Sequence, residues 1–206
     1  MADKPLAIIT GASAGIGEAL AYRLAKAGYD LILTGRNEQR LTHVAQRCQQ
    51  DYQACVSAHL FDLCDRDSLA QWCDAILAQG RAIDLLVNNA GRGIAGPFVD
   101  NDWSVVDEVI QLNMTALTYI CHRLLLAMIA TKHGKILNVA SMAAFIPGPN
   151  MAVYYASKAY VHSLSLALDA ECGYQPMPWL NGHALFWSGE NATIKRPATA
   201  SKHNDR

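Results

Sequence analysis

The sequence of 206 residues lacks a long uninterrupted hydrophobic run, an excess of charge of either sign, an internal repeat and a low-complexity tract. Its apolar stretches are too short or too interrupted to predict a membrane span, and its N-terminus does not read as a signal peptide. A net charge of -1 gives no electrostatic case for binding nucleic acid or an anionic membrane. The length suits one domain with a sizeable core.

Cysteines in the pattern of a disulfide framework or a zinc site are also missing. There is no C-x-x-C and no pair of histidines at ligand spacing, and the six cysteines are scattered at 48, 55, 64, 73, 121 and 172. Such scattered cysteines fit reduced thiols in a cytoplasm better than disulfides or zinc ligands. We therefore expect a cytoplasmic protein without a metal.

Short apolar runs alternate with helical patterns along the chain. Strands are expected at 6–10, 29–34, 54–61, 83–87 and 135–140. Helices are expected from the first glycine-rich loop to 27, at 37–50, 67–78 and 103–128, and from about 152 to 168. This alternation predicts an α/β fold with a doubly wound, Rossmann-like parallel sheet covered on both faces.

A glycine-rich loop, T-G-A-S-A-G-I-G at 10–17, separates the first expected strand from the first helix. Glycines let the backbone turn tightly and approach a phosphate, and a helix N-terminus offers free N–H groups and a positive dipole end. The spacing is G-x-x-x-G-x-G and differs from the general G-x-G-x-x-G fingerprint. Because the loop lies between a strand and a helix, it predicts a site for a nucleotide pyrophosphate.

Arg36 follows the second expected strand, where NAD-binding folds place an acidic residue for the ribose 2′-hydroxyl. An arginine at this place can pair with a 2′-phosphate. The alternative is an ordinary solvated arginine, which the upstream glycine loop disfavours. The sequence therefore predicts that NADP(H) is preferred over NAD(H).

Polar residues gather at the carboxyl ends of the expected strands: the glycine loop, Arg36, Asp62, Asn89 and Ser141. Ligands of parallel α/β sheets bind outside this edge. The convergence favours one shared site over five unrelated structural residues.

The stretch from Ser141 to Lys158 carries a candidate for proton transfer. Tyr154 and Lys158 are four residues apart, so one helical face carries both the phenol and the ammonium. A nearby ammonium favours the phenolate, which helps a phenol give or take a proton near neutral pH. The serine hydroxyl can hydrogen-bond a substrate oxygen. Taken alone, the stretch also fits a serine at a strand end followed by a packed tyrosine.

Together these motifs resemble the short-chain dehydrogenase/reductase family, of the type with T-G-x-x-x-G-x-G. The similarity rests on residues 10–17, N-N-A-G at 88–91, Asn113, Ser141 and Y-Y-A-S-K at 154–158, in the family's order over about residues 5 to 170. It implies reversible hydride transfer between NADP(H) and a carbonyl or alcohol carbon of a small molecule. It also implies a homo-oligomer for the intact family member.

The resemblance assigns roles in catalysis. Tyr154 would be the acid/base, and Lys158 would stabilise its phenolate and hold the nicotinamide ribose. Ser141 would orient and polarise the substrate carbonyl, and Asn113 would hold a water in a proton relay. Tyr155 is the rival to Tyr154, but the family's Tyr-x-x-x-Lys spacing and the separation from the serine both select Tyr154.

The resemblance also implies a cofactor site. Asp62 and Leu63 would contact the adenine, and the N-N-A-G segment would line the cleft. The complete set is Thr10, Gly11, Ser13, Gly15, Ile16, Gly17, Arg36, Asp62, Leu63, Asn89, Ala90, Gly91, Tyr154 and Lys158.

The family pattern stops after about residue 171. Residues 1–171 read as the Rossmann-like domain, and 172–206 read as a divergent tail without strand-like alternation, whose polar, Pro-containing part is expected to be disordered. The family's last two strands would then be missing. We therefore expect the strand at 135–140 to be an uncovered apolar edge.

Back-translation offers a reason for this departure. Codons allowed for 173–187, read one base later, permit V-T-S-L-C-P-G-S-T-V-T-R-F-F, which is similar to the family's sixth strand and Pro-Gly turn. Our hypothesis is a frameshift near 171–174, and the alternative is a genuine divergent tail with chance codon compatibility. A gene sequence that does not encode the shifted V-T-x-x-C-P-G string would refute the frameshift.

Two functions follow. One is an NADP-dependent oxidoreductase, and the other is an inactive truncated remnant or an NADPH-binding interaction module. The glycine loop, Arg36 and Asn89 support both. Only Ser141, Tyr154 and Lys158 favour the enzyme, whereas the divergent tail makes activity of this 206-residue form doubtful.

Overall fold

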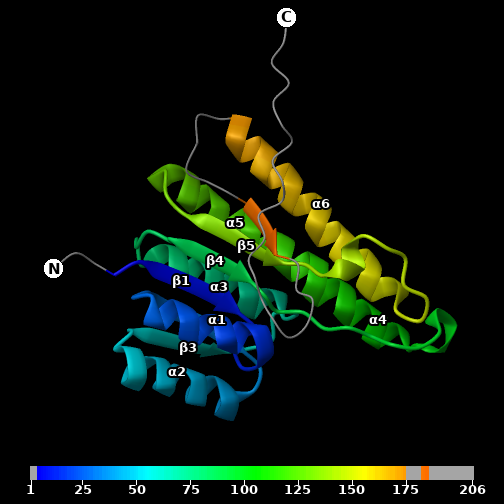
Figure 1. Cartoon of the computed structure of the whole chain (residues 1–206), viewed down its shortest axis with the longest axis horizontal. Helices are drawn as coiled ribbons and strands as arrows, with labels where there is room; N and C mark the ends of the chain where they lie inside the picture. The colour runs from blue at the N-terminus through cyan, green and yellow to red at the C-terminus, as the bar shows by residue number, and fades with distance from the viewer. Residues whose placement is uncertain (1–3, 175–181, 186–206) are drawn as a thin grey trace, which may run out of the picture.

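A computed structural model describes residues 4–174 and 182–185 as a parallel sheet between helical layers (Figure 1). The described strands are β1 Leu6–Thr10, β2 Asp30–Gly35, β3 Val56–Leu60, β4 Leu85–Asn88, β5 Lys135–Val139 and β6 Gly182–Leu185. The α-helices are α1 Gly15–Lys26, α2 Glu38–Tyr52, α3 Arg66–Ala78, α4 Trp103–Ile110, α5 Leu117–Thr131 and α6 Ala152–Tyr174. Single turns of 3₁₀ helix occur at η1 Phe98–Asp100 and η3 Met142–Ala144. The Rossmann-like α/β fold expected from the sequence is confirmed.

The sheet order is β3-β2-β1-β4-β5-β6, and every described pair of neighbouring strands is parallel. The chain builds outward from β1 to β3 on one side and then returns to place β4 on the other side of β1. This reversal leaves a crevice at the carboxyl ends of β1 and β4, which is where such sheets bind ligands. The glycine loop leaves β1 at this point, and N-N-A-G leaves β4.

Two hydrophobic cores lie on opposite faces of the sheet. Ile8 and Leu86 contribute to the core that α3, α5 and α6 cover. Their chain neighbours Ile9 and Val87 contribute to the core that α1 and α2 cover. Because successive strand residues face opposite sides, the central strands β1 and β4 must be apolar at nearly every position, which explains their apolar runs.

The segment expected as one or two helices at 103–128 is broken by a π-helix, η2 Gln111–Ala116, between α4 and α5. Asn113 lies within it and is 1% exposed. A π turn inserts extra backbone into a helix and is frequent at functional sites. The Asn113 side chain is thereby placed inside the molecule.

Trp103–Thr131 is long and apolar enough to cross a membrane by length and composition alone, although no membrane span is expected from the sequence. Its apolar side chains include Leu117, Ile120, Leu124 and Met128, which are buried in the core over the sheet. Covering the sheet accounts for the apolar residues on that face of the helix.

The tail differs from the sequence expectation at two places. Residues 172–174 continue α6, and β6 pairs with β5 from Ile136↔Gly182 to Val139↔Leu185 (Figure 1). The expectation that β5 is an uncovered edge is therefore wrong over this stretch. An open edge presents backbone N–H and C=O groups that an extended segment can pair with whatever its side-chain pattern. The predicted disorder falls on 175–181 and 186–206, which lie outside the described residues.

Replacing Leu124 by Ala tests the α5 side of the core. Leu124 is 0% exposed, so the change should lower the free energy of unfolding by about 2–5 kcal/mol through lost burial and a residual cavity. Leu126→Ala is the matched control, because Leu126 is 63% exposed on the same helix. Equal losses in urea unfolding for the two variants would contradict the described packing.

Candidate active site

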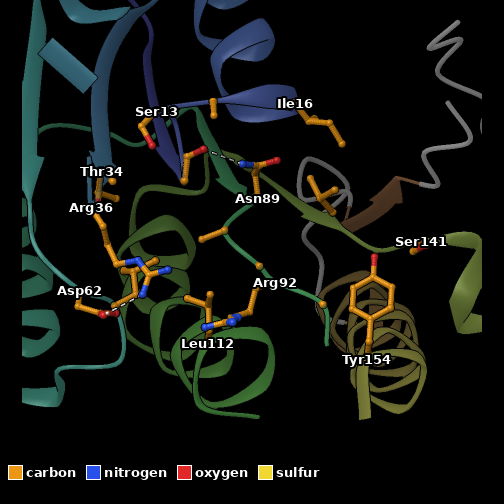
Figure 2. Close-up of a pocket in the computed structure, with 18 of the residues that line it drawn as sticks. Ser13, Ile16, Thr34, Arg36, Asp62, Asn89, Arg92, Leu112, Ser141 and Tyr154 are labelled. Carbon is orange, nitrogen blue, oxygen red and sulfur yellow. Dashed lines mark hydrogen bonds and ion pairs between the residues drawn. The ribbon is translucent and has the colours of Figure 1, made fainter. Parts of the chain in front are cut away.

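A pocket of about 910 Å³ opens at the carboxyl edge of the sheet. Its walls come from the ends of β1 to β5 and from the first turns of α6 (Figure 2). The sequence-predicted residues that line it are Gly11, Ser13, Ile16, Arg36, Asp62, Leu63, Asn89, Ala90, Gly91, Ser141, Tyr154 and Lys158. The fold thus brings together residues up to nearly 150 positions apart, in one cavity of the size that small-molecule and cofactor sites have.

Thr10 does not line the pocket but ties β1 to β4. Its Oγ1 accepts hydrogen bonds from the backbone N–H groups of Asn89 (3.0 Å) and Ala90 (3.1 Å). In return, the Asn89 side-chain amide donates to the carbonyl oxygens of Thr10 (3.0 Å) and Gly11 (3.1 Å). These four hydrogen bonds fix the glycine loop against the N-N-A-G segment.

Gly11 and Gly17 permit this close approach. A Cβ on Gly11, which has φ +67°, would lie 2.8 Å from Ala90 Cα. A Cβ on Gly17 would lie 2.2 Å from the Gly11 carbonyl oxygen and 2.5 Å from Asn89 Nδ2. Both distances are too short for real atoms, so the loop closes only with glycine at these positions. Gly15, also outside the lining, begins α1 with φ +60°.

The N-terminus of α1 has no side-chain cap among the described residues, and its N-cap residue, Ala14, lines the pocket. By contrast, the side chains of Asn37 and Asp65 cap α2 and α3. The first N–H groups of a helix need acceptors, and an anion can supply them. The residues present therefore fit a pyrophosphate bound at α1.

An ion-pair network lies at the Arg36 end of the pocket. Arg36 Nη1 is 3.2 Å from Asp62 Oδ2, drawn in Figure 2, and 3.0 Å from Glu108 Oε1. Arg92 pairs with the other oxygen of Glu108. The hydrogen bond from Arg92, with a further one from Arg36, lowers the pKa of Glu108. Burial works against ionisation of Asp62, but a backbone hydrogen bond from Cys64 and the charge of Arg36 hold its pKa below the ordinary value.

The side chain of Asn113 hydrogen-bonds neighbouring protein groups and does not line the pocket. Its Nδ2 donates to the Arg92 carbonyl and to Ser157 Oγ, both at 2.9 Å, and its Oδ1 accepts from the Arg92 N–H at 3.0 Å. The side chain therefore holds the chain after N-N-A-G against α6. The water-holding role implied by the family stays a prediction.

Tyr154 and Lys158 lie one helical turn apart at the other end of the pocket. Lys158 Nζ is 5.9 Å from the centre of the Tyr154 ring and donates to the Val139 carbonyl at 2.8 Å. Lys158 is only 6% exposed, and burial lowers its pKa to about 8. Tyr155 instead packs against the loop at Gly148, where a Cβ would lie 2.4 Å from its ring. The pocket thus receives the first tyrosine of the pair.

Ser141 follows β5, and its Oγ accepts the N–H of Ala143 at 3.2 Å. This contact orients the side chain and leaves the hydroxyl proton available to a second acceptor. Figure 2 shows the phenol oxygen of Tyr154 directed toward the segment that carries Ser141. Both hydroxyl groups therefore belong to residues that line the same cavity.

Sequence reasoning missed several residues of the site. The further lining residues are Ala14, Thr34, Gly35, Asn37, Phe61, Arg92, Gly93, Leu112, Val139, Ala140 and Met151. Most are chain neighbours of residues that were identified, and Arg92 follows N-N-A-G directly, so its position alone could have marked it. Nothing in the pattern marks Glu108.

Comparisons with known proteins agree with this geometry. The family model for short chain dehydrogenases matches residues 5–176. An uncharacterized oxidoreductase of Staphylococcus saprophyticus is 34% identical over 169 residues, covering 82% of this chain and 72% of that protein. Sulfoacetaldehyde reductase 2 of Chromohalobacter salexigens is 37% identical over 168 residues, covering 81% of this chain and 66% of that protein.

A solved short-chain dehydrogenase from Sphingobium yanoikuyae, in complex with NADPH, superposes with a TM-score of 0.82 at 34% identity. The match covers 88% of this chain and 70% of that one. This chain thus shares both its fold and part of its sequence with these oxidoreductases, including the region of the glycine loop, the N-N-A-G segment and the Tyr154–Lys158 pair. The chain belongs to the short-chain dehydrogenase/reductase family.

Proposed function

We propose that this protein is an NADP(H)-dependent oxidoreductase that transfers a hydride between nicotinamide and a carbonyl or alcohol carbon, with Tyr154 as acid/base. One observation carries the proposal: a single pocket has an uncapped helix N-terminus at one end and Tyr154, Lys158 and Ser141 at the other. The NADPH complex of the Sphingobium yanoikuyae relative supports the choice of cofactor.

The pocket residues fit such a cofactor in three places. The N-terminus of α1 would hold the pyrophosphate, and Arg36 would hold a 2′-phosphate. Asp62 and Leu63 would contact the adenine, as the family resemblance implies. The cofactor supplies the hydride, and the protein supplies binding, orientation and a proton.

In the reduction direction, the hydroxyl of Ser141 donates a hydrogen bond to the substrate carbonyl oxygen and polarises the bond. Tyr154 then gives its phenolic proton to the same oxygen as negative charge develops there. The ammonium of Lys158, one turn along α6, stabilises the phenolate that remains. In the oxidation direction, the same phenolate accepts the proton of the alcohol.

Family members act on small molecules, and we extend this to a carbonyl or alcohol substrate here. Scattered free thiols and a net charge of -1 support a cytoplasmic protein without nucleic-acid or membrane partners. The family resemblance supports a homo-oligomer for the intact family member. Residues 1–171 would form the catalytic domain and 172–206 a divergent tail. The alternative is an NADPH-binding module without catalysis. It would bind the same nucleotide as the enzyme but would not convert a substrate.

Tyr154→Phe should abolish NADPH oxidation with a panel of ketones and aldehydes, because the variant has no proton to give. NADPH binding, followed by calorimetry, should stay within about twofold of the wild-type value, because the ring remains in place. Tyr155→Phe is the matched control and should keep turnover. A dead Tyr155 variant would move the assignment by one residue, and wild-type binding without any turnover would favour the non-catalytic module.

Arg36→Gln should weaken NADPH binding by roughly tenfold or more, as expected for the loss of a charge-assisted hydrogen bond, and leave NADH binding nearly unchanged. Lys26→Gln removes the same charge from an exposed position in the last turn of α1 and should affect neither. Equal losses for NADPH and NADH in Arg36→Gln would contradict the 2′-phosphate assignment.

Burial of Lys158 should make stability depend on pH. The folded pKa of about 8 lies below the ordinary 10.5, so between these values the unfolded chain binds more protons. The free energy of unfolding contributed by this residue therefore rises with pH across that window, by at most about 3 kcal/mol. In urea unfolding, the free energy of unfolding of the wild type relative to that of Lys158→Met should be higher at pH 10 than at pH 7. A pH-independent difference between the two proteins would refute the lowered pKa.

A further inference from the structure

Glu108 joins the two arginines at the Arg36 end of the pocket, although it belongs to none of the recognised motifs. It lies on α4, with Oε1 3.0 Å from Arg36 Nη1 and Oε2 paired with Arg92. Arg36 comes from the end of β2, and Arg92 from the loop after β4. One carboxylate thus links three segments that are distant in the sequence.

The charges of this network balance before any ligand arrives. Arg36 and Arg92 are positive, Asp62 and Glu108 are negative, and Arg36 contacts both carboxylates. A guanidinium has a limited number of donors, so a phosphate that binds Arg36 must share or displace the carboxylates already there. A second anion beside the same cation also repels the incoming phosphate.

The two carboxylates are not equivalent. Asp62 also accepts the backbone N–H of Cys64 at 2.9 Å, and it lines the pocket, so it contributes to the β3 end and to the cavity itself. Glu108 is not among the residues that line the pocket, and its side-chain hydrogen bonds in the described part of the chain are with the two arginines. Its effect on a ligand therefore passes through Arg36 and Arg92.

We propose that Glu108 is a specificity-determining residue that competes with the 2′-phosphate of NADP(H) for Arg36 and so moderates the preference for NADP(H) over NAD(H). The proposal rests on the proposed function, because it requires the pocket to bind a nicotinamide dinucleotide. NAD(H) carries a hydroxyl in place of the 2′-phosphate, so it meets little of this competition. Arg92 holds the carboxylate in the position from which it reaches Arg36.

Calorimetric titration of the full 206-residue chain with NADPH and, separately, with NADH tests the proposal. Glu108→Gln keeps the size of the side chain and removes its charge, and should tighten NADPH binding roughly fivefold, the scale of one partly exposed ion pair. NADH binding should change by less than about twofold. The matched control is Asp107→Asn, which removes the same charge from the neighbouring position, where the carboxylate accepts a hydrogen bond from Gln111.

A second pair of variants separates competition from a general gain of positive potential. In an Arg36→Gln background, Glu108→Gln should no longer favour NADPH, because the cation for which it competes is gone. Glu108→Asp, which keeps the charge but shortens the side chain, should give a smaller gain than Glu108→Gln.

The proposal is overturned if NADPH and NADH tighten equally, if Asp107→Asn has the same effect, or if the gain persists without Arg36. Wild-type protein that binds NADH but shows no NADPH preference, together with a Glu108→Gln variant that acquires one, supports it. Wild-type protein that binds neither nucleotide refutes the proposed function, and this inference with it, whereas normal wild-type binding with an unchanged Glu108→Gln variant refutes this inference alone.

Discussion

The contact between the ends of β1 and β4 is the constraint on which the site depends. Four hydrogen bonds cross this contact between Thr10 and Gly11 on one side and Asn89 and Ala90 on the other. Gly11 and Gly17 allow an approach that any side chain would block. The reversal of strand order beside β1 creates the crevice, and these hydrogen bonds fix the backbone at its base. Arg36 leaves the strand beside β1, and Arg92 follows the N-N-A-G segment that contains Asn89, so both arginines are placed relative to this contact.

The same region contains buried polar groups. Lys158 is buried with a lowered pKa, and at neutral pH its charge costs folding free energy. Asn113 lies in a π turn and ties the N-N-A-G loop to α6 through Arg92 and Ser157. Such local costs are typical of functional sites and are offset by the rest of the fold. Here the offset comes from two continuous cores on either face of the sheet.

Much of this could be predicted from the sequence, because buried parallel strands, glycine turns and the Tyr-x-x-x-Lys spacing are local patterns. The strand at 6–10 agrees with β1, and twelve predicted site residues line the pocket. Arg36 and Glu108 pair although they are 72 positions apart, so no local sequence pattern predicts their contact. The π turn at Gln111–Ala116 interrupts a sequence whose pattern predicts an ordinary helix. β6 arises from backbone pairing with an open edge, which side-chain alternation does not report.

We propose that one pocket holds the phosphates of the cofactor at the glycine loop and presents its nicotinamide to Tyr154. A crystal structure of the 206-residue chain with NADP⁺ would show whether it does. We expect a pyrophosphate at the N-terminus of α1, a 2′-phosphate hydrogen-bonded to Arg36 and a nicotinamide ring beside Tyr154 and Ser141. A nucleotide bound elsewhere, or in this pocket with its nicotinamide away from Tyr154, would refute the proposal.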